Sequence, residues 1–406
     1  MTPTSVPLLI VDDDPVFSRL VRQLVLSLGG EFPCAPQCVG SAEDALTELG
    51  HNHYEVVLLD YNLPNADGLK LLAQIREFPS AEQPAVIMLT ASGNEAVAVE
   101  AMKRGAKDYL TKADLDVSPL ARAVHNALSQ KRLADQVARY NAERQADLDM
   151  ARQLQHSLLP DRYPNFPRIA APADSALRFT HRFCPAAELA GDFFSVVALS
   201  DTEAGVFICD VMGHGVRSAL VTAMLRAFMD DLAPRGTDPA WFLAEMNRKL
   251  CALIQPSADP VFATAFYLIA DVGRGQLRFA NAGHPRPLHL RRRAGVAAPL
   301  PRPERPGPAL GLIADATYTT GQLPLAPDDL VLLFTDGLFE VVAADGQEDF
   351  GQQRLLITAD KHMKLPPAEL LDAILAEVRQ FSGGAEFTDD VCLLALEVAQ
   401  IVLPVA

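Results

Sequence analysis

The feature that most constrains this chain is one long helical stretch, Ser118 to Leu159. Ser118 is a suitable N-cap, Pro119 fits the first turn of a helix, and Pro160 follows the last apolar residue. Apolar residues recur at helical spacing throughout the stretch, and charged or polar residues fill most positions between them. A single helix of this length divides the chain into two parts, which have different sequence patterns.

The apolar stripe of this helix is narrow, and its other faces are charged. A lone helix of this kind has too little surrounding domain to bury its stripe, so a partner helix is the simplest solution. Lys131 and Arg144 interrupt the heptads. We therefore expect an imperfect two-stranded coiled coil that makes the protein a homodimer. The alternative is that the helix packs along its own domains.

Composition excludes several classes of protein. The chain has 406 residues, of which 49% are hydrophobic, so it can form two or three domains with real cores. Its formal net charge of -16 disfavours binding to nucleic acid or to an anionic membrane. The six cysteines form no CxxC pair, which indicates free thiols in a reducing cytoplasm. The apolar run Val6 to Val11 lacks a basic leader and reads as a core strand, and no apolar run is long enough to span a bilayer.

The first part, residues 1–117, alternates short apolar runs with amphipathic helical patterns. This alternation predicts an α/β fold in which helices cover both faces of a doubly wound parallel sheet. The expected strands are Leu8–Val11, Val56–Leu59, Val86–Leu89 and Asp108–Leu110. The expected helices are Asp14–Leu28, Ala42–Leu49, Gly68–Phe78 and Asn94–Arg104. Ligands in such sheets bind beyond the carboxyl ends of the strands.

Polar residues follow these predicted strands at their carboxyl ends. Asp12 and Asp13 come after the first strand, and Asp60 comes after the next clear one. Three carboxylates at one sheet edge repel one another unless a hard cation neutralises them, and an all-oxygen set suits Mg²⁺. Thr90 and Lys112 follow two further strands and can contact the oxygens of a phosphoryl group. Alternatively, each acid caps the helix that follows it.

The segments VDDDP, LLDYNLPNADG, MLTA and GAKDYLTK closely resemble the receiver domains of two-component response regulators, whose fold is flavodoxin-like. The resemblance implies that Asp60 is the phosphoacceptor. It assigns Mg²⁺ to Asp12, Asp13, Asp60 and the carbonyl of Asn62, the phosphoryl oxygens to Thr90 and Lys112, and the aromatic switch to Tyr109. Ala113 stands where the family usually has proline, often after a cis bond, so we expect a rearranged loop there.

The second part, residues 161–406, contains many strand-like runs and few helices. The expected strands are Arg178–Phe183, Val206–Val211, Thr264–Asp271, Gln276–Ala280, Leu330–Thr335 and Val391–Val398. The expected helices are Val216–Leu232, Asp238–Leu253 and Pro367–Phe381. This order predicts an α+β domain of layered sheets flanked by helices. We expect residues 118–160 to form the last receiver helix, which continues as a coiled-coil linker to this second domain.

Acids of the second part stand at strand ends, often beside glycine. They are Asp192, Asp210, Asp336, Asp389 and Asp390. Each alone is more often a turn or helix-cap residue, but together they predict a centre for two divalent cations that acts on phosphorus. Gly213 and Gly215 permit close approach of the backbone. His214 between them is a candidate proton donor or an ordinary turn residue.

The segments PAAELAGDFF, DVMGHG, NAGHPRP, LLFTDGLFEVVAADGQEDFG and FTDDVCLLALEV resemble the PPM (protein phosphatase 2C-like) family, in its bacterial branch that acts on sigma-factor regulators. The resemblance implies that two Mn²⁺ or Mg²⁺ ions are held by Asp192, Asp210, Asp336, Asp389 and the carbonyl of Val211, with Asp390 in support. Ala190 and Ser195 depart from the family pattern without removing a ligand.

These expectations describe a cytoplasmic two-component response regulator whose output is a metal-dependent serine/threonine protein phosphatase. The resemblance implies a sensor histidine kinase or phosphotransfer protein as phosphodonor and a phosphorylated anti-sigma-factor antagonist as substrate. The alternative is a non-catalytic adaptor whose phosphatase-like domain binds a sigma factor or its regulator. Loss of metal-binding acids would mark such an adaptor, and here the acids are present.

Overall fold

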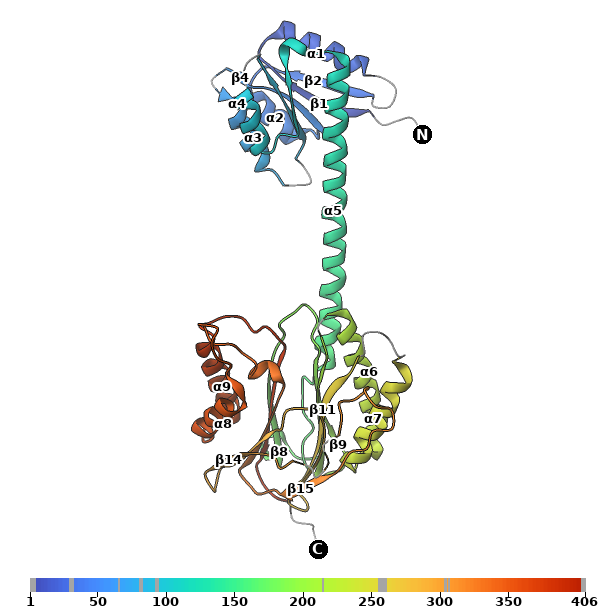
Figure 1. Cartoon of the computed structure of the whole chain (residues 1–406), viewed down its shortest axis with the longest axis vertical. Helices are drawn as coiled ribbons and strands as arrows, with labels where there is room; N and C mark the ends of the chain where they lie inside the picture. The colour runs from blue at the N-terminus through green and yellow to red at the C-terminus, as the bar shows by residue number, and fades with distance from the viewer. Residues whose placement is uncertain are drawn as a thin grey trace. The chain divides into compact units, whose positions relative to one another are not determined.

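The chain forms two compact units, Met1–Gln145 and Ala146–Ala406 (Figure 1). The computed structural model describes residues 5–28, 33–64, 66–79, 83–91, 95–213, 215–254, 261–302, 305 and 307–402. Each unit has its own hydrophobic cores. The two-part organisation predicted from the sequence is therefore present.

The first unit contains a five-stranded parallel sheet with strand order β2-β1-β3-β6-β7. Its strands are β1 (Val6–Val11), β2 (Cys34–Val39), β3 (Val56–Asp60), β6 (Ala85–Thr90) and β7 (Asp108–Thr111). This is the flavodoxin-like order, so the predicted fold is confirmed. The edge strand β2 was missing from the prediction because Pro36 and Gln37 interrupt its apolar residues and only β1 pairs with it.

Helices cover both faces of this sheet, since every β1 residue from Leu8 to Val11 is buried. The helices are α1 (Pro15–Ser27), α2 (Ala42–His51), α3 (Gly68–Arg76), α4 (Glu95–Lys103) and the start of α5. Leu8 and Ile10 pack against α1 and α5, whereas Leu9 and Val11 pack on the opposite face with α2 and α3. Successive side chains of a strand point to opposite faces, so a strand that is buried on both faces needs a near-continuous apolar run. Two short strands, β4 (Asn62–Leu63) and β5 (Ala66–Asp67), form a hairpin after β3.

The long helix α5 spans Val117–Leu158 and confirms the predicted helix to within one residue at each end. Its first turns are part of the first unit, where Leu120, Val124 and Leu128 are buried. Further along, Leu133 and Val137 expose 63% and 52% of their surface, so this chain alone does not bury the stripe. Among the helices of the described residues, none is both long and apolar enough to cross a membrane.

The second unit contains two five-stranded antiparallel sheets with orders β15-β12-β11-β10-β9 and β14-β13-β16-β17-β8. The strands of the first are β9 (Asp192–Ala198), β10 (Glu203–Val211), β11 (Ala263–Asp271), β12 (Gln276–Ala282) and β15 (Gly321–Pro324). Those of the second are β8 (Leu177–Cys184), β13 (Leu288–Arg291), β14 (Val296–Pro299), β16 (Asp329–Phe334) and β17 (Val391–Val398).

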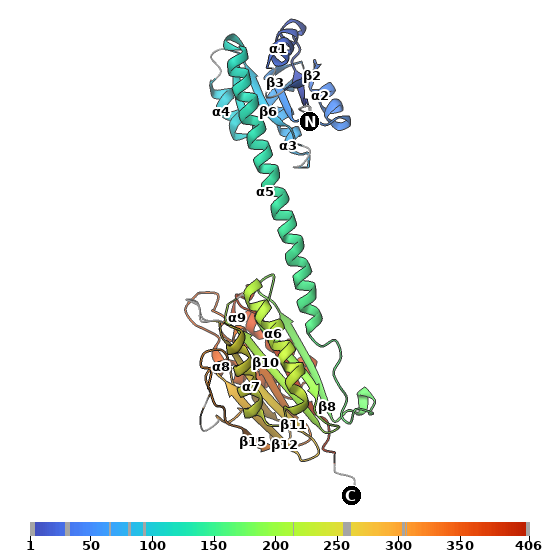
Figure 2. The same cartoon turned by 90° about the vertical axis from the view of Figure 1, so that its right-hand side faces the viewer.

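Two pairs of helices flank these sheets, and Figure 2 shows α6 and α7 lying over the β10–β12 sheet. The helices are α6 (Val216–Leu232), α7 (Pro239–Leu253), α8 (Gly351–His362) and α9 (Pro367–Phe381). Short 3₁₀ turns lie at Lys112–Asp114, Pro172–Asp174, Ala233–Arg235 and Asp336–Leu338. The prediction omitted α8, in which only Leu355, Thr358 and Ala359 are buried, because so few apolar contacts leave a weak periodic pattern.

Three cores hold the layers of the second unit together. Val206 and Ile208 of β10 point into the core between the sheets, whereas Phe207 and Cys209 point toward α6 and α7. Strand β17 divides in the same way between the central core and the core under α8 and α9. Both faces of the central strands are thus buried, and the predicted layered α+β fold is confirmed.

Candidate functional site

The first acidic site lies at the carboxyl edge of the parallel sheet. Asp12 directly follows β1, Asp60 ends β3, and Lys112 follows β7. The Nζ atom of Lys112 lies 2.7 Å from Oδ2 of Asp12 and 2.9 Å from Oδ2 of Asp60. Together with the exposed Asp13, the two buried acids can place one ligand oxygen each within 4.8 Å of one another. The structure therefore brings these four predicted residues together.

The surroundings of Asp60 fit a divalent cation. Its Oδ1 atom is buried and has no hydrogen-bond partner among the described residues. Burial raises the pKa of the Asp60 carboxyl, the hydrogen bond from Lys112 lowers it, and the charge of Asp12 raises it again. A hard cation would give the free oxygen a partner and neutralise the crowded carboxylates.

The other predicted residues of this site lie around the same edge. Thr90 is the last residue of β6 and is buried, whereas Tyr109 in β7 exposes 43% of its surface. The backbone of Asn62 lowers the pKa of the Asp60 carboxyl. The bond between Lys112 and Ala113 is trans, and these residues begin a 3₁₀ turn.

The second acidic site is built where the two antiparallel sheets end. Asp192 begins β9, and the register pairs it directly with Asp210 of β10. Asp336 begins the 3₁₀ turn after β16, and Asp389 and Asp390 immediately precede β17, which pairs with β16. Burial and then the charges of Asp336 and Asp389 raise the pKa of Asp210 to about 7. Acids from both sheets therefore act on one another electrostatically.

The acids of this second site have different partners. Thr335 Oγ1 donates a 2.7 Å hydrogen bond to Asp192 Oδ2. Both oxygens of Asp390 accept backbone N–H groups, from Ala186 at 2.8 Å and from Gly191 at 2.6 Å. Asp390 thus holds the loop that leads into Asp192. Sequence reasoning missed Thr335, although its hydroxyl precedes Asp336 at a strand end.

Glycines bring the backbone close to these acids. A Cβ atom on Gly191 would lie 2.7 Å from the carbonyl oxygen of Val211, and one on Gly337 would lie 2.2 Å from that of Asp390. Gly213 and Gly215 have φ values of 83° and 93°, a region that favours glycine. The candidate proton donor His214 lies outside the described residues.

The acids of the second site are less tightly grouped than those of the first. Within the described ranges, Asp12, Asp13 and Asp60 form the one set of three acid, histidine or cysteine side chains with ligand atoms all within 4.8 Å. Burial and then the charge of Asp210 nevertheless raise the pKa of Asp192 well above its usual value. A set of oxygen donors that resist ionisation together fits divalent cations, which would stabilise their charged forms.

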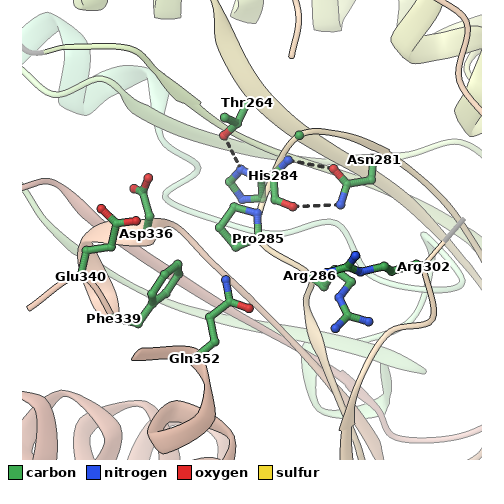
Figure 3. Close-up of a pocket in the computed structure, with 11 residues that line it drawn as sticks. Thr264, Asn281, His284, Pro285, Arg286, Arg302, Asp336, Phe339, Glu340 and Gln352 are labelled. Carbon is green, nitrogen blue, oxygen red and sulfur yellow. Dashed lines mark hydrogen bonds between the residues drawn. The ribbon is translucent and has the colours of Figure 1, made fainter. Parts of the chain in front are cut away.

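A pocket of about 380 Å³ opens beside Asp336 (Figure 3). It is lined by Thr264, Asn281, Gly283, His284, Pro285, Arg286, Arg302, Asp336, Phe339, Glu340 and Gln352. Burial and then the charges of Asp336 and Asp389 raise the pKa of Glu340. Sequence reasoning missed Glu340, Arg286 and Arg302, because only the fold brings them to one pocket.

Comparisons with known proteins identify both units. The response regulator receiver domain family matches residues 8–124, and the Stage II sporulation protein E (SpoIIE) family matches residues 200–399. The solved SiaA-PP2C domain of Pseudomonas aeruginosa superposes with a TM-score of 0.52 at 26% identity, covering 67% of this chain and 99% of that one. The chain joins a receiver domain to a PP2C-like domain of the SpoIIE family. The resemblances found in the sequence are thereby confirmed.

Two Bacillus subtilis proteins are among the relatives of this chain. Phosphoserine phosphatase RsbP is 26% identical over 253 residues, which are 62% of this chain and 58% of RsbP. Phosphoserine phosphatase RsbU is 26% identical over 251 residues, which are 61% of this chain and 69% of RsbU. The chain thus spans less than two thirds of the length of RsbP.

Proposed function

We propose that this protein is a response regulator in which phosphorylation of Asp60 controls a metal-dependent serine/threonine protein phosphatase. The observation that carries the proposal is the cross-strand pair Asp192 and Asp210, whose charges act on each other and on Asp336. We assign residues 1–117 to the receiver core, 118–160 to the last receiver helix and linker, and 161–406 to the phosphatase domain.

In the phosphatase domain, we assign two Mn²⁺ or Mg²⁺ ions to Asp192, Asp210, Asp336, Asp389 and the carbonyl of Val211. When bound, the metals supply an activated water and neutralise the charge of the phosphoryl group. The charge of Asp210 acts on Asp192, and the charge of Asp336 acts on Asp210, so Asp210 would help to hold both ions. Asp390 acts as a positioning residue through the backbone of Ala186 and Gly191.

In the receiver domain, Asp60 accepts a phosphoryl group from a sensor kinase or phosphotransfer protein. Asp12, Asp13, Asp60 and the carbonyl of Asn62 hold Mg²⁺. The Lys112 ammonium already lies 2.9 Å from Asp60, where it neutralises an oxygen of the incoming group. Thr90 is the second contact of that group, and Tyr109 is the exposed aromatic side chain whose position reports it.

The substrate class follows from the relatives. RsbP and RsbU are phosphoserine phosphatases, which supports phosphoserine or phosphothreonine on a protein, and the resemblance to the sigma-regulator branch favours an anti-sigma-factor antagonist. The absence of CxxC pairs and the free cysteines support a cytoplasmic location. The exposed stripe of α5 supports a homodimer through the linker helix.

Hydrolysis of p-nitrophenyl phosphate in the presence of Mn²⁺ tests the proposal without knowledge of the substrate. We expect metal-dependent turnover that is lost in Asp210→Asn. Asp201→Asn is the matched control, because Asp201 is exposed in the turn at the far end of the β9–β10 hairpin. Absent turnover in the parent would reject the enzyme and favour the non-catalytic adaptor, whereas turnover that survives in Asp210→Asn would reject Asp210 as a metal ligand.

A further inference from the structure

The pocket beside Asp336 has charges of opposite sign on its two sides. Figure 3 shows Asp336 and Glu340 on one side and the neighbouring Arg286 and Arg302 on the other. His284, Pro285, Phe339 and Gln352 lie between them. A ligand that fills the pocket would meet the acidic centre at one end and two guanidinium groups at the other.

The segment that carries Arg286 is held in place by polar contacts. The side chain of Asn281 accepts the N–H of His284 at 2.8 Å and donates to its carbonyl oxygen at 2.9 Å. The ring of His284 is itself hydrogen-bonded through Nδ1 to Thr264 Oγ1 at 2.8 Å. Arg286 Nη1 donates to the carbonyl oxygen of Leu300 at 3.1 Å. Arg286 is thus positioned before any ligand binds, which lowers the entropy lost on binding.

The two arginines lack an acidic partner among the described residues, in which neither forms an ion pair within 4.0 Å. Burial and then the positive charge of Arg302 lower the pKa of Arg286. Arg286 is partly buried and Arg302 is exposed, and two guanidinium groups that repel each other favour an anion between them. Planar carboxylates match the fork of an arginine, which can donate two parallel hydrogen bonds.

We propose that Arg286 and Arg302 form a specificity subsite that binds a Glu or Asp side chain flanking the phosphorylated residue of the protein substrate. This inference rests on the proposed phosphatase function, because the phosphoryl group is taken to bind at the acidic end. The arginines lie on the opposite side of the pocket from Asp336, so they suit a neighbouring side chain of the substrate (Figure 3). The enzyme would then prefer phosphoserine in an acidic context.

Peptide binding measures the subsite apart from catalysis. The probes are fluorescein-labelled peptides with one phosphoserine and Glu, Ala or Lys at the flanking positions on either side. Fluorescence anisotropy with Mn²⁺ in the full-length parent protein, using peptides in which a non-hydrolysable phosphonate analogue replaces phosphoserine, prevents turnover and yields Kd for each peptide. We expect the Glu peptides to bind best, with their Kd raised about tenfold by Arg286→Ala and about threefold by the more exposed Arg302→Ala. Arg291→Ala, at an exposed position outside the pocket, is the control.

A charge reversal sharpens the test. Arg286→Glu should weaken binding of the Glu peptides and strengthen binding of the Lys peptides, an exchange that misfolding would not produce. In the active parent, Arg286→Ala should raise KM for Glu phosphopeptides but leave p-nitrophenyl phosphate turnover unchanged. Equal Kd values for Glu, Ala and Lys peptides, with intact p-nitrophenyl phosphate turnover, would overturn the subsite and leave the phosphatase standing. Loss of that turnover in the parent would instead reject the proposed function.

Discussion

Asp192 of β9 and Asp210 of β10 are direct partners across an antiparallel strand pair. Opposite residues of such a pair project from the same face of the sheet, so their carboxylates repel each other. Burial and the charge of Asp210 raise the pKa of Asp192, which records this repulsion. A cation between the strands would reverse the sign of the interaction, which explains why a fold would tolerate two acids there.

Metal binding should therefore stabilise the PP2C-like domain, and the acids should differ in importance. Saturating Mn²⁺ at about 100 times its Kd contributes about 2.7 kcal/mol, which raises Tm by several degrees. We expect Asp210→Asn to abolish this shift in a thermal unfolding scan and to lower kcat/KM by roughly 10²- to 10³-fold. Asp390→Asn should keep most of the Mn²⁺ shift but lower Tm itself. The substitution removes one of the two side-chain oxygens that accept backbone N–H groups. A full Mn²⁺ shift in Asp210→Asn would contradict the assignment.

The receiver domain should be phosphorylated at Asp60. Incubation with acetyl phosphate and Mg²⁺ should add one phosphoryl group, visible by intact-mass spectrometry, because Asp60 lies beside the charge of Lys112. Asp60→Asn should remain unmodified, whereas Asp44→Asn, an exposed position on α2, should be modified like the parent. A phosphoryl group that persists in Asp60→Asn would rule out this residue as the acceptor.

His284 should make stability depend on pH. Burial lowers its pKa to about 3, whereas an unfolded histidine takes up a proton near pH 6.5. Its contribution is thus fully present above pH 6.5 and is lost toward pH 3 at up to about 1.4 kcal/mol per pH unit. Urea unfolding followed by Trp241 fluorescence should show the stability difference between the parent and His284→Gln shrinking by about 1 kcal/mol from pH 7.5 to pH 5.5. A stability difference that does not change with pH would contradict a buried neutral ring at His284. His53→Gln, at an exposed site, is the control.

The exposed stripe of α5 should form the dimer. Val137→Glu combined with Leu148→Glu places charge on the stripe and should convert a dimer seen by light scattering into a monomer. The same variant should lose the response of phosphatase activity to acetyl phosphate, a coupling expected to be about 1 to 3 kcal/mol. Arg139→Glu with Ala146→Glu, on the opposite face, is the matched control. If the double variant stays dimeric and its phosphatase activity still responds to acetyl phosphate, the helix acts only as a spacer.

The sequence by itself determined the fold class of both units. Near-continuous apolar runs such as Leu8–Val11 predicted strands buried on both faces, and the long periodic stretch predicted α5. The acids after Val11, Leu59 and Thr335 could be chosen as site residues because strand ends of a sheet meet in space. These signals are local, since each depends on the periodicity of neighbouring side chains.

Tertiary structure decided which of these residues act on one another. Three contacts join residues far apart in the chain. Asp192 pairs with Asp210, the Asp390 carboxylate accepts the backbone N–H of Gly191, and Thr335 donates a hydrogen bond to Asp192. Arg286 and Arg302 were ordinary loop residues until the fold brought them to the pocket of Asp336. Periodicity records which face of an element is buried, but strand register and sheet packing select the partner, so contacts between distant residues emerge only in the folded chain.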